Sequence, residues 1–176
     1  MRVSAILVGL MAIGGGALVA AQAGDNKALI HSAMSAGPAS LTENATIKDN
    51  DGNVLREGAN GWTCYPEAET IGPMCNDAQW DALIAAVQSR QPFEATGFGV
   101  SYMLAGEGDA IGTSNKDPYA TEPTEDNDWV KEGPHMMLIV PDPAMLEKLS
   151  TDPRDPVYVM WKDTPYAHVM VRIAEK

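Results

Sequence analysis

The chain has 176 residues, and its 24 acidic and 12 basic side chains give a formal net charge of −12 at pH 7. A charge of this sign repels nucleic acids and anionic membranes, so we expect no nucleic-acid partner. A chain of this length suits one domain with one buried core.

The first 23 residues are expected to be a cleaved signal peptide, followed by a soluble mature chain. Arg2 gives this segment a positive start, an apolar stretch follows, and Ala21 and Ala23 stand where signal peptidase reads small residues. Cleavage after Ala23 predicts a periplasmic or secreted protein, whereas an uncleaved membrane anchor is the alternative. No later apolar run in the sequence is long enough to span a bilayer, so we expect no stable membrane insertion after cleavage.

The chain has two cysteines, Cys64 and Cys75. In the oxidising compartment that export implies, they are expected to form one disulfide. The short loop between them would stabilise the fold by about 3 kcal/mol on the chain-entropy model. Because the redox motif C-x-x-C is absent, the bridge is interpreted as structural.

Residues 24–44 are expected to form an N-terminal arm, either frayed or as a short helix. Two alternating runs then flank Asp51-Gly52, a pair typical of a two-residue type I′ hairpin turn. The same stretch suggests a calcium loop, but Ile47 and Gly58 stand where an EF-hand needs its first and last acidic ligands. The hairpin is therefore the preferred interpretation.

The clearest helical pattern spans residues 77–90, after a short strand at 60–66 in which Trp62 is the expected core residue. Asn76 or Asp77 caps this helix, and Gln91-Pro92 ends it. Its apolar residues recur on one face with helical spacing: Trp80, Leu83, Ile84 and Val87.

The later elements are mostly strands, which places the chain in the α+β class. We expect a single domain at 45–176 with a mainly antiparallel sheet, one principal helix (77–90) packed on it and one disulfide. The remaining elements are strands at 97–108, 135–140, 157–161 and 166–173, a short helix at 142–150, and a long polar segment at 109–134.

Two stretches repeat the spacing His-x-Met, and residues two apart share one face of a strand. His135 and Met137 therefore face one way, and so do Tyr166, His168, Met170 and Arg172. With residue 135 opposite 170 and 137 opposite 168, each histidine would lie beside a methionine of the other strand, with Met103, Met160 and Trp161 expected nearby.

Imidazole and thioether groups together suit Cu(I). The residues resemble the His/Met/Trp copper sites of small periplasmic copper-binding proteins, and this resemblance implies a metal site at His135, Met137, His168 and Met170. The alternative is that the methionines fill the core and the histidines are structural.

An organic ligand is a second possibility. Tyr102, Tyr166, His168 and Arg172 are candidates to line a pocket for a small polar or anionic molecule, with the segment 109–134 as a lid that carries Tyr119 and Trp129. The acidic side chains of this segment are candidate calcium ligands, although such a run is more often simply solvated.

Hydrolase chemistry is a weaker hypothesis. Ser101 in "GVSYM" follows a glycine as in a nucleophile elbow, but the second glycine is replaced by Met103. A triad with His135 or His168 can be written, as it can for most chains that contain histidine. No catalytic residue is therefore assigned.

Three blocks, "VLREGANGWTCYP", "GPHMMLIVPDP" and "MWKDTPYAHVMV", resemble those of small exported bacterial proteins. The resemblance implies export, a single domain and a bacterial source, and it brings no catalytic residue. Our hypothesis is a non-catalytic binding module of the bacterial envelope, with copper binding as the sharpest alternative.

Overall fold

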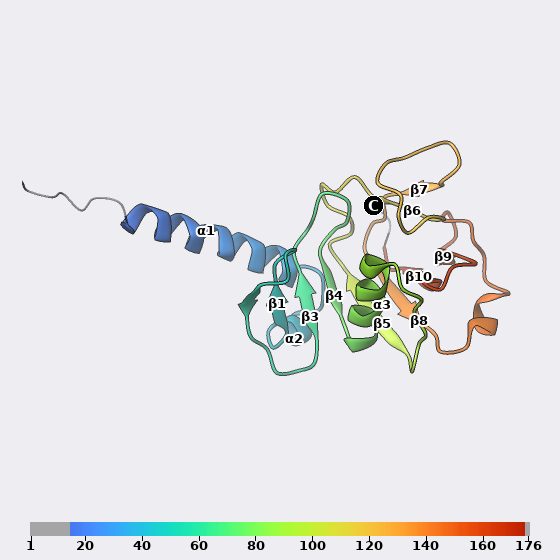
Figure 1. The fold of residues 1–176 in the computed structure, drawn as a ribbon, viewed down its shortest axis with the longest axis horizontal. Helices are drawn as coiled ribbons and strands as arrows, with labels where there is room; N and C mark the ends of the chain where they lie inside the picture. The colour runs from blue at the N-terminus through green and yellow to red at the C-terminus, as the bar shows by residue number, and fades with distance from the viewer. Residues whose placement is uncertain (1–14, 175–176) are drawn as a thin grey trace, which may run out of the picture.

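The computed structural model describes residues 15–174, and its first helix, α1 (Gly15–Met34), projects from the body of the molecule (Figure 1). This helix runs through the expected cleavage point after Ala23, while residues 1–14 of the expected signal peptide lie outside the described residues. The C-terminal part of α1 contacts the sheet, and α2 (Ala39–Thr42) follows it. Within residues 15–174, no helix combines the length and the apolar character that a membrane span requires.

Strands predominate in the described residues, and most of them join one eight-stranded sheet with the order β2-β1-β3-β4-β5-β8-β10-β9. Neighbouring strands are antiparallel except for β1 and β3, which are parallel. The strands of this sheet are β1 (Thr46–Lys48), β2 (Val54–Arg56), β3 (Thr63–Tyr65), β4 (Met74–Asn76), β5 (Gly99–Met103), β8 (His135–Ile139), β9 (Val157–Met160) and β10 (His168–Arg172).

The expected hairpin at the start of the domain is present, but the expected two-residue turn is wrong. Lys48 pairs with Val54, so residues 49–53 separate the two strands. The Asp49 carboxylate accepts hydrogen bonds from the N–H groups of Asp51 (3.0 Å) and Asn53 (2.8 Å). This side chain stabilises a longer turn by replacing the backbone partners that a tight turn would supply.

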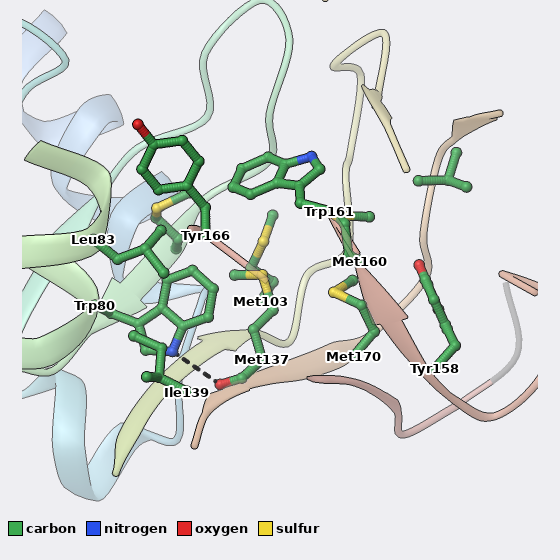
Figure 2. Packing of buried hydrophobic residues seen from close by; sticks show 12 residues of the cluster. Trp80, Leu83, Met103, Met137, Ile139, Tyr158, Met160, Trp161, Tyr166 and Met170 are labelled. Atoms are coloured by element: carbon green, nitrogen blue, oxygen red, sulfur yellow. Dashed lines mark hydrogen bonds between the residues drawn. The ribbon is translucent and has the colours of Figure 1, made fainter. Parts of the chain in front are cut away.

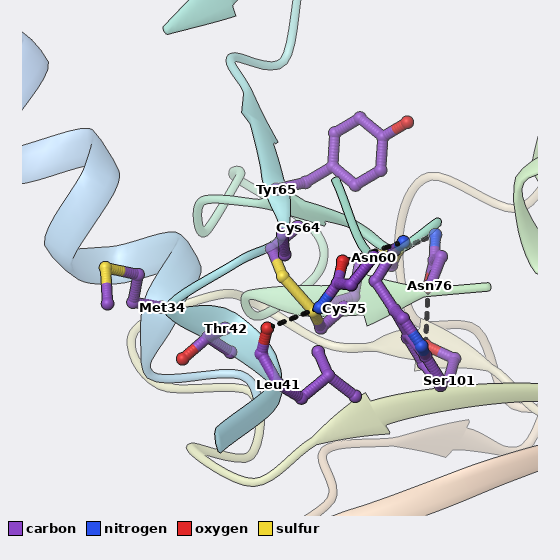
Figure 3. The surroundings of a disulfide bond; sticks show 12 residues. Met34, Leu41, Thr42, Asn60, Cys64, Tyr65, Cys75, Asn76 and Ser101 are labelled. Carbon is purple, nitrogen blue, oxygen red and sulfur yellow. Dashed lines mark hydrogen bonds between the residues drawn. A yellow bond between two sulfur atoms is a disulfide. The ribbon is translucent and has the colours of Figure 1, made fainter. Parts of the chain in front are cut away.

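The disulfide is confirmed between Cys64 of β3 and Cys75 of β4, which stand directly opposite each other in the sheet. Figure 3 shows the bond close to the end of α1, where Met34 lies. Both cysteines are fully buried in a cluster that includes Ala33 of the same helix. The bridge therefore stabilises the face of the sheet that α1 covers.

The helix expected at 77–90 is present as α3 (Ala78–Ser89), packed on the other face of the sheet from α1 (Figure 1), although α1 is the longer of the two helices. Asp77 caps it, because its carboxylate accepts from the N–H groups of Gln79 and Trp80 at 3.0 Å. Trp80 is buried under the helix, and its indole N–H donates to the carbonyl of Met137 in β8 at 3.1 Å. This bond fixes α3 above the central strands.

The expected register of the two His-x-Met strands is wrong by two residues. Met137 pairs with Met170, and His135 pairs with Arg172. A shift of two residues keeps every side chain on its expected face, because faces alternate with a period of two. Both histidines therefore do lie on one side of the sheet, as expected.

The segment 109–134 is long and largely irregular, as expected, but it contains a small second sheet of β6 (Thr113–Ser114) and β7 (Trp129–Val130). Its excursion reaches α3, where Tyr119 lies under the guanidinium of Arg90 at 4.5 Å from the ring centre. The short helix expected at 142–150 is a single 3₁₀ turn, Pro143–Leu146.

Candidate functional site

The candidate site lies on the face of the sheet that α3 covers. Strand register places His135 between Met103 of β5 and Arg172 of β10, and it places His168 directly opposite Met160 of β9. Met137 and Met170 form the row between the two histidines. Each histidine thus has a methionine opposite it on a neighbouring strand, although not the partner that the expected register gave.

Between this face and α3 lies a cavity of about 20 Å³, which we call the methionine cavity. A volume of this size accommodates one water molecule or one ion and excludes an organic ligand. Figure 2 shows methionines pointing into the space between Trp80, Trp161 and Tyr166. The cavity is lined by Ile71, Met74, Trp80, Ile84, Met103, Glu107, Thr113, His135, Met137, Met160, Trp161, His168 and Met170.

His168 is a fully enclosed polar side chain of the methionine cavity. Its Nδ1 lies 2.9 Å from the carbonyl oxygen of Tyr166, which only accepts, so Nδ1 carries the proton and Nε2 keeps its lone pair. Edge-on contacts with Trp80 and Trp161, at ring separations of 4.9 and 5.1 Å, hold the imidazole in place. Burial lowers the pKa of His168 to about 4, so the ring is neutral at pH 7.

His135 repeats this arrangement at the other end of the methionine row. Its Nδ1 donates to the carbonyl of Gly133 at 2.7 Å, which again leaves the Nε2 lone pair free. Burial lowers the pKa of His135; the hydrogen bond to Gly133 and the charge of Glu132 only partly offset this effect, and the charge of Arg172 adds to it. Among the described residues, neither histidine Nε2 has a hydrogen-bond partner, although both side chains are 1% exposed.

Unpartnered buried nitrogens are rare in folded proteins, because a polar atom removed from water without a partner costs about 1–3 kcal/mol. A backbone carbonyl that holds Nδ1 while Nε2 is left free is also the arrangement of many metal-binding histidines. The cavity also contains thioether sulfurs, which are lone-pair donors. Met137 and Met170 lie on the same strands as the histidines, and Met103 and Met160 lie on the adjacent strands β5 and β9.

The fifth methionine of the cavity, Met74, is engaged elsewhere. Its sulfur accepts a hydrogen bond from the side-chain amide of Asn76 at 3.4 Å. Among residues 15–174, no three side chains of His, Cys, Asp and Glu converge as a metal-binding group, so any metal site here depends on sulfur from methionine.

A partly buried ion pair lies beside His135, because Arg172 stands opposite this histidine in the sheet. Arg172 contacts both carboxylate oxygens of Glu132, at 3.0 and 3.1 Å, and the Tyr158 hydroxyl donates to the same carboxylate at 3.0 Å. Burial and the charge of Glu132 raise the pKa of Tyr158. Glu107, whose carboxylate accepts from the N–H of Gly72 at 2.7 Å, is the cavity's own acidic residue.

The four residues expected to line an organic-ligand pocket do not converge. Tyr102 lies on the opposite face of β5 and stacks near Trp62, at a ring separation of 5.6 Å. The Tyr166 hydroxyl bonds to Tyr119 and to the carbonyl of Gln91, and Arg172 is held by Glu132. The structure therefore does not bring these four side chains together, because the parity of β5 places Tyr102 on the opposite face from His168.

Ser101 and two carboxylates of the acidic segment form hydrogen bonds with other residues of the fold and do not form the expected catalytic or calcium-binding groups. Ser101 is fully buried, and its hydroxyl donates to Asn76 at 2.6 Å rather than meeting a histidine. In the acidic segment, the Asp117 carboxylate accepts from the N–H of Tyr119, and Glu132 points into the ion pair with Arg172. The triad written with Ser101 therefore lacks its base in this fold.

The sequence did not indicate four of the cavity residues, Ile71, Met74, Glu107 and Thr113, and it placed Trp80 and Ile84 only on the apolar face of the helix. Met74 lies in a short strand after Pro73, and Glu107 lies in a turn after β5, so neither carries a periodic pattern. The only indication in the sequence that Glu107 lies in a packed region is the glycine next to it, because Gly72 packs closely against the backbone of Gly106 and Glu107.

Comparison of the chain with known protein families, with curated proteins and with solved structures gave no match.

Proposed function

We propose that this protein is a non-catalytic, exported binding protein that holds one Cu(I) ion in the methionine cavity. The observation that carries the proposal is a pair of buried, neutral imidazoles, each with an unpartnered Nε2, in a closed space shared with thioether sulfurs. Among the described residues, four buried side-chain nitrogen or oxygen atoms have no partner, and only the two imidazole nitrogens belong to residues that line the methionine cavity.

The chemistry of the donors favours Cu(I) over other common metal ions. Thioether and imidazole donors suit this soft monovalent ion, whereas Mg²⁺ and Ca²⁺ need several oxygen ligands. The methionine cavity has one carboxylate, that of Glu107, and apart from the two histidines and Thr113 its remaining lining is apolar, aromatic or sulfur-bearing. A neutral His135 and a neutral His168 need no proton release before they bind, so the site is ready at pH 7.

Burial supports the same oxidation state. A small, mostly apolar site with few charged ligands disfavours Cu(II), which prefers nitrogen and oxygen donors in a tetragonal arrangement. The cavity lies under α3 and between two tryptophans, Trp80 and Trp161, which shield it. An ion bound there is protected from oxidation.

Placement in the bacterial envelope is part of the proposal and is supported by two features. The N-terminal sequence has the pattern of a signal peptide, and the disulfide between Cys64 and Cys75 is typical of an oxidising compartment. Copper entering a cell from outside meets this compartment first, and a carrier there limits the reactivity of the free ion.

The test is anaerobic competition for Cu(I) between the purified protein and a chromophoric Cu(I) chelator. We expect the wild type to take one equivalent from the chelator, and His168→Ala to weaken the affinity by at least about tenfold, or roughly 1.4 kcal/mol. The matched control is His31→Ala, which removes the third histidine at an exposed position of α1. Near-ultraviolet circular dichroism reports whether each variant keeps its packing.

Two outcomes would contradict the proposal. One is a wild-type protein that leaves the chelator spectrum unchanged, which would mean that water alone satisfies the imidazoles. The other is an equal loss of affinity in His31→Ala and His168→Ala, which would place the bound copper outside the methionine cavity.

A further inference from the structure

We propose that Glu107 supplies the negative charge that balances one cation in the methionine cavity, so that the site favours a singly charged soft ion over a divalent one. This inference rests on the proposed function and adds a specificity-determining residue to it. It follows from the backbone that places this carboxyl group inside the fold, from the charges of the other lining residues and from the cost of burying an unbalanced charge.

The backbone around Glu107 turns an acidic side chain inward. Glu107 is 4% exposed, and Gly106 and Gly108 on either side of it have positive φ angles of 66° and 55°. Glycine adopts this left-handed conformation without the steric cost that other residues meet. Glutamate is rarely buried so deeply. The turn around Glu107 is therefore built to hold a carboxyl group inside the protein.

Close packing fixes this turn at the wall of the cavity. The N–H of Glu107 donates to the carbonyl of Glu132 at 3.0 Å, and the carboxylate of Glu107 accepts from the N–H of Gly72 at 2.7 Å. A Cβ atom at Gly72 would clash with the carbonyl oxygen of Gly106, so only glycine allows this approach. Donation by an N–H group favours the ionised form of a carboxyl group. The Gly72 N–H thus stabilises the charge without neutralising it.

The lining of the methionine cavity contributes one formal charge. Among the described residues that line it, Glu107 is the only acid, and none is lysine or arginine. His135 and His168 are neutral at pH 7, and methionine sulfur carries no charge. A monovalent cation therefore gives a site with no net charge, whereas a divalent ion leaves one positive charge unbalanced.

The apolar surroundings make this difference in charge important. Trp80, Trp161 and the methionines of the cavity are buried and belong to the hydrophobic core. A net charge in such surroundings is costly, and opposite charges in one small space attract each other strongly because little water screens them. A cavity of about 20 Å³ has no room for a second ion. The charge of Glu107 is therefore expected to raise cation affinity even without a direct bond to the ion.

A purely structural role for Glu107 is the alternative, since its carboxylate satisfies the buried N–H of Gly72. Glutamine distinguishes the two roles. Its amide oxygen accepts the same hydrogen bond from a side chain of nearly the same shape, but it carries no charge. A structural acceptor can therefore be exchanged for glutamine without loss of cation affinity, whereas a balancing charge cannot.

The test compares Glu107→Gln with wild-type protein in anaerobic competition for Cu(I) against a chromophoric chelator. We expect Glu107→Gln to lower the Cu(I) affinity by at least about tenfold, as the loss of one partner of a close charge pair does. The affinity for Ag(I), a soft monovalent ion that stays in one oxidation state, should fall by a similar factor. Near-ultraviolet circular dichroism reports whether the variant keeps its packing.

The matched control is Glu67→Gln. The Glu67 carboxylate accepts from the N–H of Asp109 at 3.3 Å, so it contacts the same turn, but Glu67 does not line the methionine cavity. This variant loses the same formal charge and should keep the Cu(I) affinity within about threefold, because solvent screens that charge. Equal losses in Glu67→Gln and Glu107→Gln would overturn the inference, and so would an unchanged affinity in folded Glu107→Gln.

The charge preference of the wild type provides a test that needs no variant. Cd(II) is a soft divalent ion that is smaller than Ag(I), so size does not exclude it from a site that holds Ag(I). We expect an equal concentration of Cd(II) to leave bound Ag(I) in place, as measured by equilibrium dialysis and metal analysis. Displacement of Ag(I) by Cd(II) would overturn the inference. Wild-type protein that takes up neither Cu(I) nor Ag(I) would instead remove the proposed function itself.

Discussion

At the scale of single residues, the central feature is the tautomer of His135 and His168. In both, a backbone carbonyl two residues earlier in the chain accepts from Nδ1, so the strand itself decides which nitrogen is free. The local geometry of each strand entry thus prepares Nε2 as a ligand before any metal binds. Hydrogen bonds of this kind typically change metal affinity by about 10–100-fold when they are lost.

Burial of a neutral histidine has a consequence for stability as a function of pH. The pKa of His168 is lowered to about 4 in the folded protein from an ordinary value of 6.5. As the pH falls from 6.5 to 4, His168 is protonated in the unfolded chain but stays neutral in the folded chain. The free energy of unfolding therefore decreases across this pH window and is unaffected by this histidine above it. The full loss is roughly 3 kcal/mol, at 1.36 kcal/mol per pH unit.

We therefore expect metal-free wild-type protein to lose more stability between pH 7 and pH 4 than the variant His168→Gln. Urea denaturation at a series of pH values measures the difference, and His31→Ala, which replaces an exposed histidine of α1, is the matched control. Parallel stability curves for the wild type and His168→Gln would show that the imidazole is not buried in its neutral form.

At the scale of elements, the two faces of the sheet have different roles: one contains the stabilising disulfide and the other contains the methionine cavity. On one face, α1 and the disulfide form a cluster with Ala33 and Ile47, and on the other, α3 closes the methionine cavity. The alternation within β4 makes the separation sharp, because Cys75 belongs to the first cluster and the neighbouring Met74 to the second. Stability and binding are therefore expected to respond to different substitutions.

Replacing both cysteines, Cys64→Ser with Cys75→Ser, should lower the free energy of unfolding by about 3 kcal/mol, because the bridge constrains a short loop of the unfolded chain. The stoichiometry of Cu(I) binding should stay the same. Urea denaturation measures the first quantity and chelator competition the second. Loss of copper binding in a variant that remains folded would contradict the separation of the two faces.

At the scale of the whole molecule, side-chain alternation was the part of the site that could be predicted. The period of two in "PHMMLIVPDP" and "YAHVMVRI" correctly places His135, Met137, His168 and Met170 on one face. The principal helix, the disulfide pair and the predominance of strands also followed from capping, cysteine count and local pattern.

Register and neighbours could not be predicted in the same way, because they depend on contacts that are distant in sequence. The pairing of β8 with β10 is fixed at one end by Ile173, whose N–H donates to the carbonyl of Pro134 at 2.9 Å. No local pattern encodes that bond, and a slip of two residues leaves the apolar faces unchanged. The orientation of Tyr102 failed for a related reason, since the sequence does not say which face of β5 meets α3.

The most direct test of the account is the anomalous diffraction of crystals grown anaerobically with Cu(I). We expect an anomalous peak inside the methionine cavity, in bonding contact with Nε2 of His168 and with at least one methionine sulfur. Crystals in which the cavity holds only water, or in which copper lies only on surface residues, would contradict it.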